Sequence, residues 1–327
     1  GLLSRPTVSE ILDYRDEVDQ RIVDYLDREH QWSHGLLRVV ELGLQHEQQH
    51  QELMLTDIKH VLSCNPMFPA HVEGQIHSLA PPKQRWIEFV AGLHEIGHDS
   101  DDFAFDNELP KHRVFVEPFA LMNRLVTNGE FLEFIEDGGY KRPDSWLSLG
   151  WNHVNQNALE YPLYWVRQDD DWFEFTLGGL KQLDKKLPVT HISYFEADAY
   201  ARWAGARLAT ESEWEIASAD QAIGGISAED CFVSDVPVHP TQTGGTNNFW
   251  SLFGSTWQWT SSSYSAYPGY RPTSGALGEY NGKFMCNQYV LRGSSCATSR
   301  EHTRRTYRNF FPPDARWQFT GIRLARS

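Results

Sequence analysis

The stretch PVTHISYFEADAYARWAGARLATESEWE, residues 188–215, decides the fold of the larger part of the chain. Its apolar spacing predicts helices over about 194–204 and 211–218. Around it, short apolar runs such as 86–90 and 290–292 alternate with Gly, Pro, Asn and Asp, which is typical of strands joined by turns. This stretch and its surroundings therefore predict a loop-rich domain of mixed helices and strands.

Three further motifs follow in order, FGSTWQWT at 253–260, VLRGSSCAT at 290–298 and GIRLA at 321–325. Tryptophan suits a loop-dominated core because it buries a large rigid surface, and arginine can tie loops through its fork of donors. We interpret these residues as scaffold rather than as catalytic groups. They are Trp203, Trp214, Trp257, Trp259, Arg207, Arg292 and Arg323.

Composition excludes several classes of function. A chain of 327 residues that is 40% hydrophobic can bury one large domain and a smaller one. A net charge of -15 argues against nucleic acid or an anionic membrane as partner. No run approaches the roughly 20 apolar residues of a membrane span. Four cysteines without a CxxC motif, and no visible signal peptide, favour reduced thiols and a cytoplasmic location.

Two long amphipathic helices are predicted at the start of the chain. A capping box of Thr7 and Glu10 begins the first, which runs to about residue 29, and the second spans 34–63 before Pro66. Each has one apolar stripe and needs further helices, as in a four-helix bundle, so we expect a segment upstream of the Met-less start to supply them. The predicted division is a helical segment over 1–65, a linker over 66–84 and the mixed domain over 85–327.

The strongest chemical feature is HEQQHQE, residues 46–52. His46 and His50 are one helical turn apart on one face and can share a metal ion. The same residues fit the zinc-peptidase pattern His-Glu-x-x-His with Glu47 as base, although the longer metzincin signature is absent. A solvated polar stripe is the third interpretation.

The helix cannot complete a metal site alone. Asp57 returns to the same face but about 16 Å further along. Glu52 lies two residues after His50 and points to nearly the opposite side. A third ligand must therefore come from another segment.

The four motifs of residues 188–325 are together similar to those of the formylglycine-generating-enzyme domain, a variant of the C-type-lectin fold. A helical segment with His46 and His50 ahead of such a domain resembles the non-haem iron sulfoxide synthases of ergothioneine and ovothiol biosynthesis. The resemblance implies an α+β fold, in which a partial DinB-like helical bundle precedes a C-type-lectin-like, formylglycine-generating-enzyme-like domain. It also implies an Fe(II) site with three His ligands, two of which match His46 and His50.

In that family the third His lies in an earlier helix, so the resemblance implies that it lies outside this chain. His30, His34 and His94 are weaker candidates within it. The implied activity is O2-dependent formation of a bond between the sulfur of cysteine and the imidazole of hercynine, which gives a sulfoxide. Related synthases that use histidine or selenium stay open.

Two other functions are alternatives to this one. Formylglycine formation uses a pair of copper-binding cysteines, but the matching positions are near Thr298 and Thr303 and leave Cys296 alone. That chemistry is therefore disfavoured. A non-catalytic binding module, in which the lectin-like domain recognises a ligand, stays open.

The resemblance also assigns substrate contacts. Gln49 matches the glutamine that contacts hercynine, and Asn309 matches an asparagine of the pocket. The branch that uses γ-glutamylcysteine has Trp and Asp next, and an Arg four residues after the Asp; here Phe310, Phe311 and Ala315 stand in those places. A charged γ-glutamyl group would find no ion-pair partner there, which favours free cysteine.

Three residues remain as weaker candidates. Arg316 could supply the missing positive charge to a γ-glutamyl group. Tyr264 and Tyr267 are the nearest matches to the tyrosine that donates a proton in one branch of the family. In the cysteine-using branch that tyrosine comes from the N-terminal region, which weakens both candidates.

Overall fold

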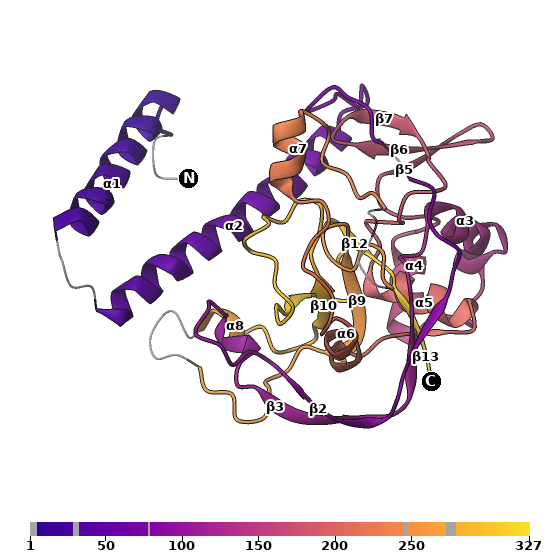
Figure 1. The fold of residues 1–327 in the computed structure, drawn as a ribbon. Helices are drawn as coiled ribbons and strands as arrows, with labels where there is room; N and C mark the ends of the chain where they lie inside the picture. The colour runs from indigo at the N-terminus through magenta and orange to yellow at the C-terminus, as the bar shows by residue number, and fades with distance from the viewer. Residues whose placement is uncertain (1–4, 29–32, 78, 243, 245–247, 273–278) are drawn as a thin grey trace. The chain divides into compact units, whose positions relative to one another are not determined.

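The chain divides into two compact units, Gly1–Gln45 and His46–Ser327, and the boundary between them falls within the second helix. None of the helices within the described ranges combines the length and the apolarity that a membrane span requires. The computed structural model (Figure 1) describes residues 5–28, 33–77, 79–242, 244, 248–272 and 279–327.

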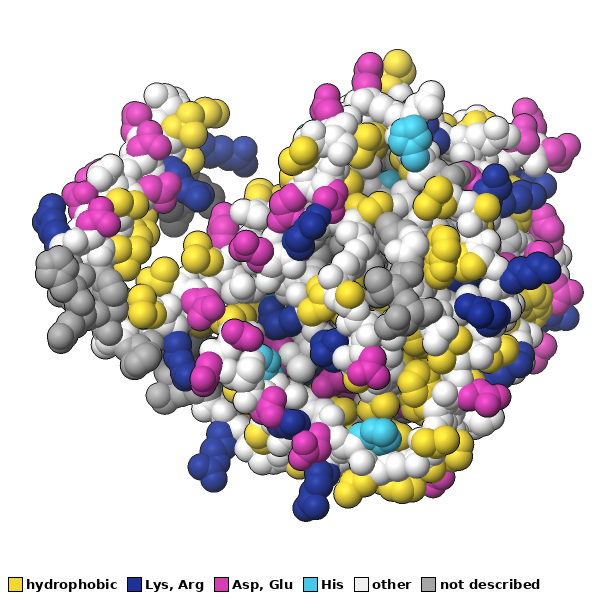
Figure 2. Space-filling model, in the orientation of Figure 1, with side chains coloured by type: hydrophobic (Ala, Val, Ile, Leu, Met, Phe, Trp, Pro, Cys, Tyr) yellow, Lys and Arg dark blue, Asp and Glu magenta, His cyan; other side chains and the backbone are white. Residues whose placement is uncertain are grey.

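The first unit contains α1 (Val8–Arg28) and the start of α2 (His34–Ser63). The predicted capping box is present, because the Thr7 N–H donates to Glu10 Oε2 at 2.7 Å. No residue of α1 is buried, and Figure 2 shows hydrophobic side chains along it. Helix α1 and the start of α2 line an apolar groove of about 650 Å³. The exposed apolar surface is what an incomplete bundle would leave, but the bundle itself stays a prediction.

The C-terminal half of α2 belongs to the second unit. Its buried residues are Glu52, Leu55, Thr56 and Lys59, which recur at the spacing of one helix face. Leu55 packs in a core cluster with residues such as Phe319. The sequence-based division placed this half with residues 1–65, whereas compactness places it with the C-terminal domain because this face is buried there.

Two four-stranded sheets form the centre of the second unit. The first has the order β1 (Trp86–Phe89), β4 (Phe119–Met122), β13 (Leu324–Arg326), β8 (Arg207–Leu208). The second has the order β11 (Asn309–Phe311), β10 (Tyr289–Gly293), β9 (Trp257–Ser263), β12 (Thr320–Gly321). The β9–β12 pair is parallel and the other pairs are antiparallel.

Two smaller sheets lie at the periphery of the domain in Figure 1. One is the antiparallel pair β2 (Gly92–Ile96) and β3 (His112–Val116). The other contains β5 (Trp165–Gln168), β6 (Asp171–Thr176) and β7 (Gly179–Gln182).

Helices α5 (Tyr194–Trp203) and α6 (Glu211–Ala217) confirm the two helices predicted for the opening stretch. Both begin with capping boxes, in which Ser193 and Thr210 accept from the backbone N–H three residues on. Six further helical segments were not predicted. They are α3 (Asn128–Glu136), α4 (Ser148–Gln156), α7 (Ala228–Ser234), α8 (Glu279–Gly282) and the short turns η1 (Asp106–Glu108) and η2 (Gly139–Lys141).

The anchor residues are mostly buried, as predicted. Trp214, Trp257 and Trp259 are each 1% exposed, and Arg292 and Arg323 are at most 1% exposed. The indole N–H of each of these three tryptophans donates a hydrogen bond; for example, that of Trp259 donates to the Ile192 carbonyl at 3.0 Å. Trp203 and Arg207 are half-buried instead. The mixed α+β class is confirmed.

Candidate metal and substrate site

His46 and His50 lie on one side of α2, with ring centroids 4.5 Å apart. The prediction that they share a helix face is therefore confirmed. Imidazoles this close can occupy two positions around one metal ion. His46 is half-buried but His50 is exposed, so the described part of the chain does not enclose the pair.

The pair supplies two ligands of the predicted three. Burial, followed by the neighbouring His50, lowers the pKa of His46, which favours the neutral imidazole that binds metals. Among the described residues, no group of three or more His, Cys, Asp and Glu side chains is placed to hold a metal ion. His30 lies outside the described residues, as does the side chain of His34, and His94 is half-buried on β2. The third ligand stays a prediction.

Glu52 fixes this part of α2 to the C-terminal domain. Its carboxylate accepts from the Trp257 indole at 2.7 Å, from Ser295 Oγ at 2.7 Å and from Thr298 Oγ1 at 2.9 Å. Burial raises the pKa of Glu52, and these three donors oppose that rise. The position of Glu52 away from the histidines was predicted, but its contacts with the C-terminal domain were not.

The loop after β10 has no copper-binding pair of cysteines. Thr298, at one of the matching positions, donates to Glu52, and Thr303 donates to the Ser299 carbonyl at 3.2 Å. Cys296 is fully buried, and burial raises the pKa of its thiol. A protonated buried thiol is a poor metal ligand and nucleophile, which agrees with the interpretation of this loop as scaffold.

Gln49, the predicted hercynine contact, is joined to the C-terminal domain. Its Nε2 donates to the hydroxyl of Tyr307 at 2.6 Å. Its Oε1 atom is buried and has no hydrogen-bond partner within the described ranges. Because Gln49 lies three residues after His46, this unpaired acceptor is carried on the same side of α2 as His46.

The predicted substrate loop forms the edge strand β11. Asn309 Oδ1 accepts from the Phe310 N–H at 2.9 Å, so its acceptor is occupied locally. Phe310 stacks on Tyr264 with centroids 3.9 Å apart, and Phe311 meets Trp317 edge-on at 4.9 Å. The loop therefore presents aromatic surface at the two positions where the γ-glutamylcysteine branch has Trp and Asp.

Arg316 has a protein partner of its own. Its Nε lies 3.0 Å from Glu196 Oε2, and its Nη2 donates to the Tyr161 carbonyl. The arginine side chain is 11% exposed and that of Glu196 is fully buried. The expectation that Arg316 could move to a substrate therefore conflicts with this pair, since leaving it would strand a buried carboxylate.

Tyr264 and Tyr267 are buried among polar side chains. The Tyr264 hydroxyl accepts from Asn107 Nδ2 at 2.9 Å, and the Tyr267 hydroxyl donates to Glu211 Oε2 at 3.4 Å. Burial raises the pKa of both phenols above the ordinary value. A phenol that holds its proton so firmly in the domain interior suits packing, so the catalytic role of the pair stays a prediction that these contacts do not favour.

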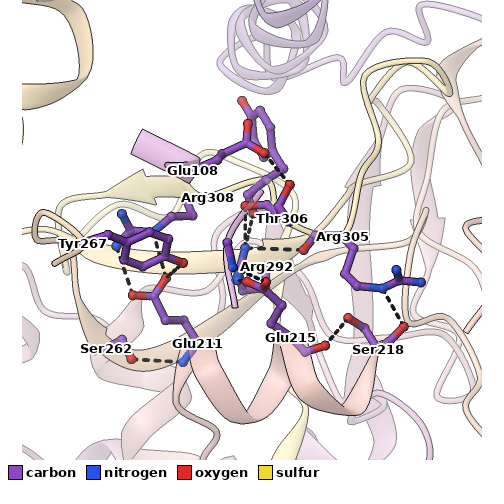
Figure 3. Close-up of polar contacts among 12 residues, drawn as sticks. Glu108, Glu211, Glu215, Ser218, Ser262, Tyr267, Arg292, Arg305, Thr306 and Arg308 are labelled. Atoms are coloured by element: carbon purple, nitrogen blue, oxygen red, sulfur yellow. Dashed lines mark hydrogen bonds and ion pairs between the residues drawn. The ribbon is translucent and has the colours of Figure 1, made fainter. Parts of the chain in front are cut away.

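A network of ion pairs fixes residues 304–308 (Figure 3). Arg292 pairs with Glu215 and donates to the carbonyls of Thr306 and Tyr307 at 2.8 Å each. The remaining contacts are Arg308 with Glu211, Arg305 with the Ser218 and Gln221 carbonyls, and Glu108 with Arg304 and Thr306. The backbone that carries Tyr307 is held from both sides by buried charge-assisted contacts.

His302 packs against Tyr307, with ring centroids 4.8 Å apart, and is 1% exposed. Burial, and secondarily Arg304, lowers the pKa of His302 to about 3. Between pH 6.5 and that value the unfolded chain binds a proton that the folded chain does not, so stability is lost as pH falls.

We expect this histidine to lower the free energy of unfolding by about 1.4 kcal/mol per pH unit below pH 6.5, or about 2 kcal/mol at pH 5. Urea unfolding of the wild type and of His302→Gln from pH 7.5 to pH 5 measures the effect. The difference in the free energy of unfolding between the wild type and His302→Gln should shrink as pH falls. If the free energies of unfolding of the two proteins changed with pH in parallel, His302 would not be the source of the pH dependence. The control is His71→Gln, because His71 is exposed.

A second buried polar group on α2 was not predicted. Lys59 Nζ lies 2.8 Å from His191 Nε2 and 4.0 Å from Glu174 Oε1. Burial lowers the pKa of Lys59 and raises that of Glu174. His239 Nε2 lies 3.6 Å from the same carboxylate. Lys59 therefore joins α2 to the domain seven residues beyond Glu52.

Comparison with known proteins agrees with this architecture. Residues 80–252 and 237–327 match the family described as "Sulfatase-modifying factor enzyme 1-like domain". The chain is 33% identical to a hercynine oxygenase of Mycobacterium tuberculosis, over 88% of this chain and 71% of the relative. A hercynine oxygenase of Mycolicibacterium smegmatis is 32% identical over 87% and 70%.

A third relative is more distant. It is "Ergothioneine biosynthesis protein 1" of Schizosaccharomyces pombe, 28% identical over 70% of this chain and 29% of the relative. The family match covers the whole mixed domain, and the mycobacterial matches extend across most of the chain. The chain therefore belongs to the family of sulfatase-modifying factor enzyme 1-like proteins that includes these hercynine oxygenases.

Proposed function

We propose that the full-length protein is an Fe(II)-dependent enzyme of ergothioneine biosynthesis that joins the sulfur of cysteine to the imidazole of hercynine and gives a sulfoxide. One O2 accepts four electrons, two from formation of the C–S bond and two from oxidation of the sulfur. One oxygen atom enters the sulfoxide and the other leaves as water.

One observation carries the proposal. His46, Gln49 and His50 lie together on α2, in a chain that matches hercynine oxygenases over nearly nine tenths of its length. An imidazole pair with an unpaired amide acceptor beside it provides for both a metal and a ligand with an N–H group. A peptidase explains the histidines but not the amide.

The donor set fits Fe(II) as far as the described residues extend. Neutral imidazole is an iron ligand, and the 4.5 Å separation of the two rings suits two positions on one ion. The third histidine is proposed to come from a segment that precedes Gly1. When bound, the iron would supply the redox chemistry of O2; the chain's own residues bind and orient the organic substrates.

The surface around β11 determines which thiol substrate the protein favours. Phe311 is held against Trp317, Ala315 is buried, and Arg316 is engaged by Glu196. No charged side chain at positions 311 and 315 could pair with a γ-glutamyl ammonium or carboxylate. The loop therefore favours cysteine over γ-glutamylcysteine.

We expect kcat/KM for cysteine to exceed that for γ-glutamylcysteine by about 10- to 150-fold, because one lost charge-assisted contact is worth about 1.5–3 kcal/mol. The measurement is turnover of both thiols with hercynine and O2. Phe311→Asp should narrow the ratio and Phe311→Leu should not. Equal kcat/KM values for cysteine and γ-glutamylcysteine in the wild type would refute this interpretation of the loop.

Metal analysis separates the proposal from a zinc peptidase on His46 and His50. The full-length protein, purified without chelators, is supplied with Fe(II) or Zn(II), and O2 uptake and peptide cleavage are measured. We expect O2 uptake that requires iron and both organic substrates. Zinc-dependent peptide cleavage without O2 uptake would replace this proposal by the peptidase.

A further inference from the structure

The phenol of Tyr307 makes a hydrogen bond that spans most of the chain. Its hydroxyl accepts from Gln49 Nε2 at 2.6 Å, across 258 positions of sequence. Tyr307 is 5% exposed, and its ring lies between Phe105, Trp257 and His302. A ring packed on several sides leaves its hydroxyl little freedom to move.

The backbone around Tyr307 is equally constrained. Arg292 donates to its carbonyl. Arg304, three positions earlier in the same loop, pairs with fully buried Glu108 and lies 4.7 Å from the ring centroid of Tyr307. Figure 3 shows the part of this network that Arg292 and Arg308 form. Charge-assisted contacts of this kind hold a loop more firmly than neutral ones.

The hydrogen bond to this hydroxyl fixes which end of the Gln49 amide is engaged, because Gln49 Nε2 is its donor. A glutamine amide has a donor end and an acceptor end, and rotation by half a turn exchanges them. The bond to Tyr307 occupies the donor end, so the buried Oε1 atom is left as an acceptor without a partner in the described structure. An unpaired buried carbonyl is unfavourable, and a ligand N–H would relieve it.

We propose that Tyr307 is a positioning residue that fixes the side-chain amide of Gln49, so that its carbonyl oxygen accepts from the ring N–H of the imidazole substrate. The inference rests on the proposed function in one respect, that the ligand is an imidazole. Neutral imidazole has one donor and one acceptor nitrogen, so a fixed acceptor selects one orientation of the ring. Tyr307 does not itself touch the substrate.

The test is a double-mutant cycle on binding. The affinity of the iron-loaded full-length protein for hercynine is measured without O2, for the wild type, Tyr307→Phe, Gln49→Leu and the double variant. We expect Tyr307→Phe to weaken binding about two- to tenfold, the range for one neutral hydrogen bond. Because Tyr307 acts through Gln49, the double variant should bind no worse than Gln49→Leu.

Tyr200→Phe is the matched control, since Tyr200 is also buried and lies on α5 against Phe131. Additive losses in the double variant, or a Tyr307→Phe variant that binds as the control does, would overturn the inference. Turnover in the same proteins is a separate readout. A non-additive cycle without C–S product would overturn the proposed function and support the positioning role.

Discussion

His50→Ala is expected to lose bound iron and turnover together. The substitution removes one of two imidazoles that lie 4.5 Å apart. A site with one ligand fewer should bind Fe(II) more weakly by at least about 100-fold, since even the loss of a group that only hydrogen-bonds to a metal ligand costs about 10- to 100-fold. His50 is exposed, so the fold should tolerate the change within about 0.5 kcal/mol.

The measurement is iron content after desalting, together with turnover of hercynine and cysteine in the full-length protein. Gln51→Ala is the control, because Gln51 is the exposed neighbour of His50 on α2. Urea unfolding of both variants shows whether the fold is intact. A His50→Ala protein that retains iron and turns over at the wild-type rate would remove His50 from the site.

Glu52→Ala is expected to lower the free energy of unfolding by about 2–5 kcal/mol, because it strands buried donors that each cost about 1–3 kcal/mol unpaired. The donors are the indole of Trp257 and the hydroxyls of Ser295 and Thr298. The two hydroxyls lie 3.1 Å apart and can partly satisfy each other, which keeps the loss below a simple sum.

Urea unfolding of Glu52→Ala beside Glu47→Ala measures this effect. Glu47 is exposed on the same helix, so its loss should change stability by no more than about 0.5 kcal/mol. Since Glu52 holds the half of α2 that carries Gln49, its loss should also weaken hercynine binding. Equal stabilities for the two variants would show that the Glu52 contacts do not hold the helix.

Local signals in the sequence predicted the elements that they control. Apolar spacing predicted α5 and α6, the capping box of Thr7 and Glu10 predicted the start of α1, and the position of Pro66 predicted the end of α2. A box of the same kind, Thr127 with Glu130, begins α3 and is a local signal for a helix that was not predicted. The N-cap residue of α4 is Leu147, whose side chain cannot cap a helix, so the start of α4 left no comparable signal.

The docking face of α2 could not be predicted from periodicity. Its buried residues are Glu52, Leu55, Thr56 and Lys59, of which a single one is apolar. A pattern search for apolar spacing passes over such a face, because polar residues are buried only where distant partners satisfy them. Those partners, such as Trp257 and His191, come from far along the chain.

In the candidate site, too, some features could be predicted from the sequence and others could not. The i, i+4 spacing of His46 and His50 predicted their shared face, which the ring separation confirms. The partners of Gln49 and Arg316 depend on contacts between segments 258 and 120 positions apart. Sequence spacing carries no information on which side chain will meet another over such separations.

The most direct measurement is product analysis with isotopic oxygen. The full-length protein is loaded with Fe(II) without O2, supplied with hercynine and cysteine, and exposed to ¹⁸O₂. The account predicts a C–S-linked sulfoxide that carries one ¹⁸O atom, with one O2 consumed for each product molecule. Oxidised cysteine alone, with no coupled product and hercynine recovered unchanged, would contradict it.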